Sequence, residues 1–288
     1  MDDCEITLEM NPKTASQEAL CAYYQAGFNR LSIGCQSANE RELKMLGRLH
    51  NFADFQSTME MARAAGFENI SADLMMSLPD QTLDSLGHSI DSIVACRPTH
   101  ISVYGLKIEG GTWFDRHKQE LNLPNEEQES EQYLFTVEKL REHGYLQYEI
   151  SNFALVGYPS RHNLKYWHGQ PYLGFGPAAY SYFENRRYGY SRSLADYIEA
   201  TMTMDFSRVL QDEETLGEDE RLQEKLLLGL RLNEGVRLSQ YPFSEKAISR
   251  IMEFVSQGLC QLQDGNLSLT PTGMLLDNYI TSDLLLYL

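Results

Sequence analysis

The segment AGFNRLS (residues 26–32) recurs as AGFENIS (residues 65–71), with the same residue at four of the seven positions. Each copy indicates the end of a helix, a glycine turn, an aromatic residue and the start of a strand. On both sides of the two copies, short strands rich in Ile, Leu and Ser alternate with helical patterns. Because repeated strand–helix units build a parallel sheet or a barrel, we predict an α/β fold whose strands are buried on both faces.

The predicted elements fall into two domains, residues 1–190 and residues 191–288. In the first domain we expect strands at residues 5–9, 30–35, 69–76, 100–106 and 145–150, and helices at residues 16–26, 40–46, 52–65, 82–96 and 126–143. In the second we expect helices at residues 194–202, 221–232 and 244–257, a hairpin around Asp264-Gly265, and a last helix from Pro271. Two helices and a hairpin are typical of a winged-helix module, so we predict a mostly helical, winged-helix-like C-terminal domain.

Charge and composition exclude several classes of protein. The 288 residues carry a net charge of −17, from 24 basic and 41 acidic side chains, which opposes non-specific binding to nucleic acid. No apolar run approaches the length of a membrane span. The start, MDDCEITLEMNP, lacks the basic and apolar regions of a secretory signal. We therefore expect a cytoplasmic protein with no nucleic-acid partner.

The cysteines do not indicate a local metal site. They stand at positions 4, 21, 35, 96 and 260, with neither CxxC nor CxxxCxxC spacing. An odd number of cysteines in a chain without secretory features favours free, buried thiols.

A segment rich in aromatic residues, residues 149–183, shows no clean helical or strand period and is predicted to be long and irregular. It contains HNLKYW (residues 162–167) and the glycine-rich LGFGPAA (residues 173–179). His162 could ligate a metal or a haem iron through its imidazole, and Tyr166 and Trp167 could flank a flat ring. The same aromatic side chains could equally pack against the barrel, so residue type alone leaves both interpretations open.

Polar side chains stand at the carboxyl ends of the predicted strands, where parallel α/β folds bind ligands. An arginine can grip a carboxylate with two hydrogen bonds, while carboxylates and amides suit ribose hydroxyls or an ammonium group. The set would therefore fit a nucleoside-bearing amino acid, although polar residues are also common at ordinary strand ends. Its members are Glu9, Gln36, Arg48, Asp73 and Lys107.

Eight motifs together resemble one family across nearly the whole chain. The family is that of the radical S-adenosylmethionine proteins similar to oxygen-independent coproporphyrinogen III oxidase, and the resemblance is greatest to its haem-chaperone branch, which HNxxYW marks. The motifs are EITLEMNP (5–12), RLSIGCQS (30–37), GRLH (47–50), DLMMSLP (73–79), ISVYGLKIE (101–109), YEISNF (148–153), HNLKYW (162–167) and YLGFGPAAYSY (172–182).

The resemblance implies a partial (β/α) barrel of the TIM type, S-adenosylmethionine, a [4Fe–4S] cluster and haem. Carried over by motif, Glu9, Gln36, Arg48 and Asp73 would contact S-adenosylmethionine, and Lys107 would lie near it. His162 would ligate the haem iron, with haem contacts from Tyr166, Trp167 and Tyr180. No catalytic residue is implied.

Two departures from the family pattern matter. The family's CxxxCxxC cluster loop precedes its EITLE-type strand, and this chain begins at that strand. We therefore expect an N-terminally truncated form that lacks the first barrel units and the cluster ligands. The second departure is Tyr180, which stands where the family usually has histidine.

These features predict a haem chaperone whose partners are haem and haem-accepting proteins, a membrane-associated recipient among them. One alternative is a coproporphyrinogen III oxidase, against which HNLKYW argues. Another is a non-catalytic remnant that serves as an interaction module. Turnover by this chain alone is not expected, because it lacks the cluster thiolates. The unpaired edge of its first strand also leads us to expect self-association.

Overall fold

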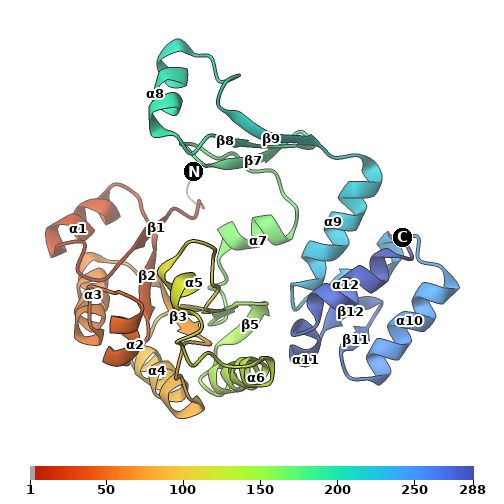
Figure 1. Cartoon of the computed structure of the whole chain (residues 1–288), viewed down its shortest axis with the longest axis horizontal. Coiled ribbons are helices and arrows are strands. Elements are labelled where there is room, and N and C mark those ends of the chain that lie inside the picture. Colours follow the sequence, from red (N-terminus) through yellow and green to blue (C-terminus); the bar gives the residue numbers. More distant parts are fainter. Residues whose placement is uncertain (1–3) are drawn as a thin grey trace. The chain divides into compact units, whose positions relative to one another are not determined.

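The computed structural model describes residues 4–288, which divide into two compact units. The first unit ends at Ser160 and the second begins at Arg161. The boundary predicted between residues 190 and 191 therefore lies inside the second unit. The HNLKYW motif, predicted to be part of the first domain, belongs to the second unit as well. The two units are described separately below (Figure 1).

The first unit is built on a six-stranded sheet in the order β1-β2-β3-β4-β6-β5. Strands β1 to β4 are parallel neighbours, as the repeat predicts, which confirms the partial barrel. The strands are β1 (Thr7–Met10), β2 (Arg30–Gln36), β3 (Asn69–Met76), β4 (His100–Gly105), β5 (Leu146–Glu149) and β6 (Asn152–Ala154). Both β5 and β6 run antiparallel to their neighbours, because a tight turn at residues 150–151 joins them as a hairpin.

The helices of the first unit begin where short polar side chains cap them. Ser16, Asn39, Asn51 and Thr82 each accept a hydrogen bond from a backbone N–H in the first helical turn. Figure 1 shows α1 to α4 and α6 around the outside of the sheet, with the short α5 drawn over the strands. They are α1 (Gln17–Gln25), α2 (Glu40–Met45), α3 (Phe52–Ala65), α4 (Leu83–Ala95), α5 (Trp113–His117) and α6 (Glu126–Glu142).

The two faces of the parallel sheet differ in chemistry. Side chains alternate between the faces along each strand, and the register aligns residues of one kind across the strands. The face toward the helices holds the core, including Leu31, Ile33, Ile70, Leu74 and Ile101. The opposite face carries Glu9, Ser32, Gly34, Ser71, Asp73 and Ser102. A polar inner face prepares this unit to hold a polar ligand.

The second unit begins with α7 (Arg161–Trp167) and the antiparallel sheet β7-β8-β9. The strands are β7 (Tyr180–Phe183), β8 (Arg186–Tyr190) and β9 (Leu210–Thr215). Residues 149–183 are thus not irregular throughout, since they include β6, α7 and β7. The turn between β7 and β8 consists of Glu184 and Asn185, both with positive φ, as a two-residue hairpin requires. Only the asparagine is typical there, so the turn was not predicted.

The rest of the second unit contains the predicted helices and hairpin. The helices are α8 (Leu194–Thr203), α9 (Glu218–Leu230), α10 (Glu245–Ser256), α11 (Pro271–Met274) and α12 (Asp277–Leu285), with a short 3-10 helix at Leu238–Gln240. A second antiparallel sheet has the order β10-β12-β11, from β10 (Val236–Arg237), β11 (Cys260–Gln263) and β12 (Asn266–Leu269). The predicted turn at Asp264-Gly265 has positive φ at both residues. Within residues 4–288, no helix has the length and apolar character needed to cross a bilayer.

The buried His100 should make the stability of the first unit depend on pH. Its Nδ1 lies 2.7 Å from the Ser71 hydroxyl and its Nε2 lies 2.9 Å from the Tyr148 hydroxyl. Burial, aided by the positive charge of Arg30, lowers the pKa of His100 to about 3. In the unfolded chain the pKa is ~6.5. As the pH falls below that value, His100 binds a proton in the unfolded state but not in the folded state. The free energy of unfolding therefore decreases.

We expect the chain to lose about 2 kcal/mol more stability between pH 7 and pH 5 than a His100→Gln variant does. Urea denaturation at both pH values measures the difference. Using the variant as the reference cancels the contribution of the carboxylates. Equal losses in the two proteins would contradict the assignment.

Strand β1 pairs with β2 on one side only, among the strands of residues 4–288. Its other edge therefore presents unpaired backbone groups that another chain can join. We expect this chain to self-associate as its concentration rises, despite a net charge of −17. Sedimentation velocity over a range of concentrations tests this, and a single monomeric species at every concentration would refute it.

Candidate functional sites

Gln36 lies at the centre of a polar cluster at the carboxyl end of β2. The pairing of β2 with β3 is interrupted by a bulge between Gly34 and Gln36, and Gln36 takes a positive φ of 68°. Such backbone strain in a non-glycine residue is typical of functional sites. The Gln36 side chain is buried, and its Oε1 accepts a hydrogen bond of 2.9 Å from the Tyr104 hydroxyl of β4. The bulge therefore aims an amide at the neighbouring strand ends.

Arg48 and Asn11 join the same cluster from two loops. The Arg48 guanidinium donates to the Asn11 side-chain oxygen over 3.2 Å. A side chain at Gly34 would begin 2.7 Å from the Gln36 amide nitrogen and 3.3 Å from the same Asn11 oxygen. Glycine at position 34 thus leaves room for the Gln36 and Asn11 side chains to approach each other. The predicted residues Gln36 and Arg48 are brought together, with Asn11 between them.

Asp73 and Glu9 give the inner face of the sheet its negative charge. Asp73 Oδ1 accepts a hydrogen bond of 3.1 Å from the Ser32 hydroxyl. Burial raises the pKa of Asp73, and the nearby Glu9 carboxylate raises it further, while hydroxyl groups such as that of Ser32 oppose the rise. Burial and the charge of Asp73 also raise the pKa of Tyr104, which the positive charge of Arg48 opposes. Glu9 and Asp73 share the inner face of the sheet, and Tyr104, whose pKa responds to both carboxylates and to Arg48, joins them to the Gln36 cluster.

Lys107 does not belong to this cluster in the structure. Its ammonium forms an ion pair of 2.9 Å with Glu109, and both side chains are largely exposed. Asn11, Ser32 and Tyr104, in contrast, were not selected from the sequence although they contact the predicted residues. Asn11 directly follows a strand, and Ser32 and Tyr104 occupy inward positions of their strands. The alternation of side chains along β2 and β4 was the signal that could have found the last two.

The cluster fits S-adenosylmethionine, whose sulfonium and ammonium groups are cationic and whose carboxylate is anionic. Glu9 and Asp73 provide negative charge, Arg48 provides positive charge, and the amides of Asn11 and Gln36 suit hydroxyl groups. The described residues do not fit a [4Fe–4S] cluster, because residues 4–288 contain no group of three or more His, Cys, Asp or Glu arranged to hold a metal. The five cysteines are free thiols.

In the second unit, α7 starts a chain of aromatic contacts. The His162 ring meets the Tyr166 ring edge-on, with centroids 4.9 Å apart. Tyr166 in turn contacts Tyr172 at 4.6 Å, and Tyr172 contacts Tyr182 of β7 at 6.4 Å. No residue of α7 is fully buried, and His162 is exposed. An exposed imidazole on a surface of aromatic rings suits a flat, apolar ligand that carries a metal.

Trp167 and Tyr180 are held by different partners. The Arg231 guanidinium lies 5.5 Å from the Trp167 ring centre, in a cation–π contact that anchors α7 to α9. The Tyr180 hydroxyl donates to the Asp212 carboxylate over 2.5 Å, and this hydrogen bond raises the pKa of Tyr180. The raised pKa keeps the Tyr180 phenol protonated. Protonation opposes the phenolate that an iron ligand would need.

Two family models match parts of the chain. Residues 1–93 match the model of the radical SAM superfamily, and residues 216–276 match that of the HemN C-terminal domain. The first match covers β1 to β3 with most of α4, and the second covers α9 to α11 completely.

The sequence is similar to several proteins over nearly its full length. The heme chaperone HemW of Bacillus subtilis is 38% identical, over 97% of this chain and 75% of the relative. The chain belongs to the HemW family. Its radical S-adenosylmethionine character and its resemblance to the coproporphyrinogen oxidases are thereby confirmed. The chain is also 34% identical to a protein of Bos taurus named radical S-adenosyl methionine domain-containing protein 1, mitochondrial. That match covers 97% of this chain and 67% of the relative.

The fold of the HemW family chain is similar to that of a solved enzyme. It matches the coproporphyrinogen III oxidase HemN of Escherichia coli with a TM-score of 0.82, over 99% of this chain and 70% of that one. The sequences are 20% identical, so this match shows the fold alone. It confirms the α/β architecture with its additional C-terminal elements.

Proposed function

We propose that this chain is a haem chaperone, which binds haem on its second unit and passes it to haem-accepting proteins. The observation that carries the proposal is α7 itself, where an exposed histidine opens a series of aromatic ring contacts. Neutral imidazole is a common haem-iron ligand, and aromatic rings bury the faces of a macrocycle. The names of the bacterial relatives agree with this chemistry.

In the first unit, we assign S-adenosylmethionine to the cluster formed by Glu9, Asn11, Gln36, Arg48 and Asp73. Arg48 would hold the ligand's carboxylate and the two acidic residues its cationic groups. The strained backbone at Gln36 supports the assignment, because strain is kept where a ligand needs a particular side-chain direction. Lys107 remains a proposed neighbour of the ligand, although it pairs with Glu109 here. The cytoplasm remains the proposed location.

Haem transfer tests the chaperone function directly. The chain is loaded with one equivalent of haem, passed through a desalting column, and mixed with an apo-haem protein of distinct Soret maximum, such as apomyoglobin. We expect the acceptor's spectrum to appear while the chain's own spectrum declines. Haem that is not retained on the column, or retained but never released to an acceptor, would contradict the proposal.

The oxidase alternative has less support. HNLKYW separates this chain from the true oxidases, and the similarity to the Escherichia coli oxidase is one of fold. Turnover of coproporphyrinogen by a form of this protein supplied with cluster ligands would favour that alternative. An interaction module without ligand binding would be favoured if neither haem nor S-adenosylmethionine bound.

A further inference from the structure

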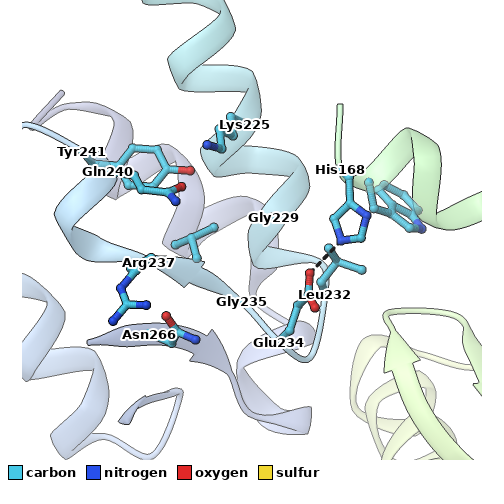
Figure 2. A pocket seen from close by; sticks show the side chains of 12 residues that line it. His168, Lys225, Gly229, Leu232, Glu234, Gly235, Arg237, Gln240, Tyr241 and Asn266 are labelled. Atoms are coloured by element: carbon cyan, nitrogen blue, oxygen red, sulfur yellow. Dashed lines mark hydrogen bonds and ion pairs between the residues drawn. The ribbon is translucent and has the colours of Figure 1, made fainter. Parts of the chain in front are cut away.

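A cavity of about 330 Å³ lies beside α7, entirely within the second unit (Figure 2). Trp167 and His168, at the end of the HNLKYW segment, form part of its wall, and the other walls come from α9, β10, β12 and the loops next to β10. His168 Nε2 lies 2.7 Å from a Glu234 carboxylate oxygen, so this acidic group is already paired within the cavity. The cavity therefore adjoins the proposed haem surface, but none of the aromatic rings in contact from His162 to Tyr182 lines it.

Two cations line this cavity without an acidic partner. Lys225 of α9 and Arg237 of β10 form no hydrogen bond or ion pair with their side chains within residues 4–288. Arg231, the residue directly after α9, is held by Asp277, and Arg250 by Asp283. Their charges are available to an anion.

A buried hydroxyl completes the donor set. Tyr241 lines the same cavity with only 6% of its surface exposed, and its hydroxyl oxygen has no hydrogen-bond partner. Such a group costs free energy unless a ligand satisfies it. Burial raises the pKa of Tyr241 to about 12, so it remains a donor at neutral pH. Figure 2 shows Lys225 and Tyr241 on one side of the cavity and Arg237 with Asn266 on another.

We infer that this cavity binds carboxylates, and that the carboxylates it takes are the propionates of the haem carried by the same unit. The inference rests on the proposed haem-binding function. A haem carries two propionates and would be repelled by a strongly acidic chain unless cations met those groups locally. Lys225 and Arg237 supply such cations beside Trp167, and Tyr241 can donate one further hydrogen bond.

Esterification tests the inference, because haem dimethyl ester keeps the ring and the iron but removes both negative charges. We expect the unaltered chain to bind haem more tightly than its dimethyl ester. Lys225→Ala and Arg237→Ala should each weaken haem binding by roughly 3- to 10-fold, as for a partly exposed charged hydrogen bond, and leave binding of the ester unchanged. Tyr241→Phe should act in the same direction. Lys246→Ala removes an exposed cation of α10 outside the cavity, and should alter neither.

The affinities of acid and ester are compared again with metal-free protoporphyrin and its dimethyl ester, by fluorescence quenching. These compounds contain no iron to ligate. The result is therefore independent of whether His162 binds iron. Equal affinity of the unaltered chain for acid and ester would overturn the propionate assignment and leave the chaperone function standing. Failure to bind any porphyrin would overturn the proposed function itself. Succinate that bound the cavity without displacing haem would assign the cations to a free carboxylate, and would also overturn the inference.

Discussion

Replacing Arg48 with alanine should weaken S-adenosylmethionine binding by roughly 10- to 100-fold, the effect of losing a charge-assisted, two-point grip on a carboxylate. Arg48 has five N–H donors, and Asn11 accepts from one of them. The contact with Asn11 positions the guanidinium so that its other donors can meet the ligand. Lysine at the same position keeps the positive charge but lacks the two parallel N–H donors of the guanidinium. Arg48→Lys should therefore recover only part of the affinity. Isothermal titration with S-adenosylmethionine measures all three proteins.

Arg41→Ala is the matched control for this experiment. Arg41 lies on the neighbouring helix α2, is exposed, and forms an ion pair of 3.1 Å with Asp80. Its removal changes the net charge by the same amount as Arg48→Ala. If both variants weakened binding equally, the effect would be one of overall charge, and the assignment of Arg48 to the ligand would be wrong.

Five of the six helices of the first unit were predictable because their signals are local, whereas the short helix α5 was not predicted. Ser16, Asn51 and Thr82 cap the helices that follow them, and each predicted helix end lies within about two residues of the observed one. The parallel order of β1 to β4 also followed from the repeat, since strand–helix units have one favoured handedness. Local patterns of this kind are encoded within a few residues.

The cluster around Gln36 was predictable only in part. Strand ends indicated Gln36 and Arg48, because the carboxyl ends of parallel strands meet at one edge. Tyr104 was missed, since it lies far along the chain and reaches Gln36 only through the register of β2, β3 and β4. Lys107 follows the same strand, but its exposed side chain pairs with Glu109. The positions of these residues in the sequence therefore identified the correct edge of the sheet. They did not show in which direction each side chain points.

The aromatic segment was harder to predict for a physical reason. Its helix α7 has no buried face, so no apolar period marks it. Strand β8 contains Gly189, and the Tyr180 ring packs directly against it. A Cβ atom at position 189 would lie only 2.8 Å from that ring. Cross-strand packing of this kind depends on pairing between β7 and β8, which the sequence of either strand does not specify.

Replacing His162 with alanine should remove the iron-ligand signature of bound haem. Without the imidazole, the Soret band of the complex should move toward that of free haem. The affinity for haem should fall at least tenfold. Loss of a residue that only orients a metal ligand already lowers metal affinity by about 10-fold or more, and His162 is the proposed ligand itself. His162 is exposed on α7, and alanine favours helices, so the fold should be retained. Haem titration followed by absorbance measures both effects, and circular dichroism checks the fold.

Two control variants isolate the role of His162. His88→Ala removes an exposed histidine of α4, in the other unit, and should leave the titration unchanged. Tyr180→Phe tests the remaining oxygen ligand. Because the Asp212 carboxylate keeps the Tyr180 phenol protonated, the double variant His162→Ala/Tyr180→Phe should bind haem no more weakly than His162→Ala alone. A further loss in the double variant would show that Tyr180 ligates the iron after all. Identical titrations for the unaltered chain and His162→Ala would mean that α7 presents aromatic packing and not a ligand.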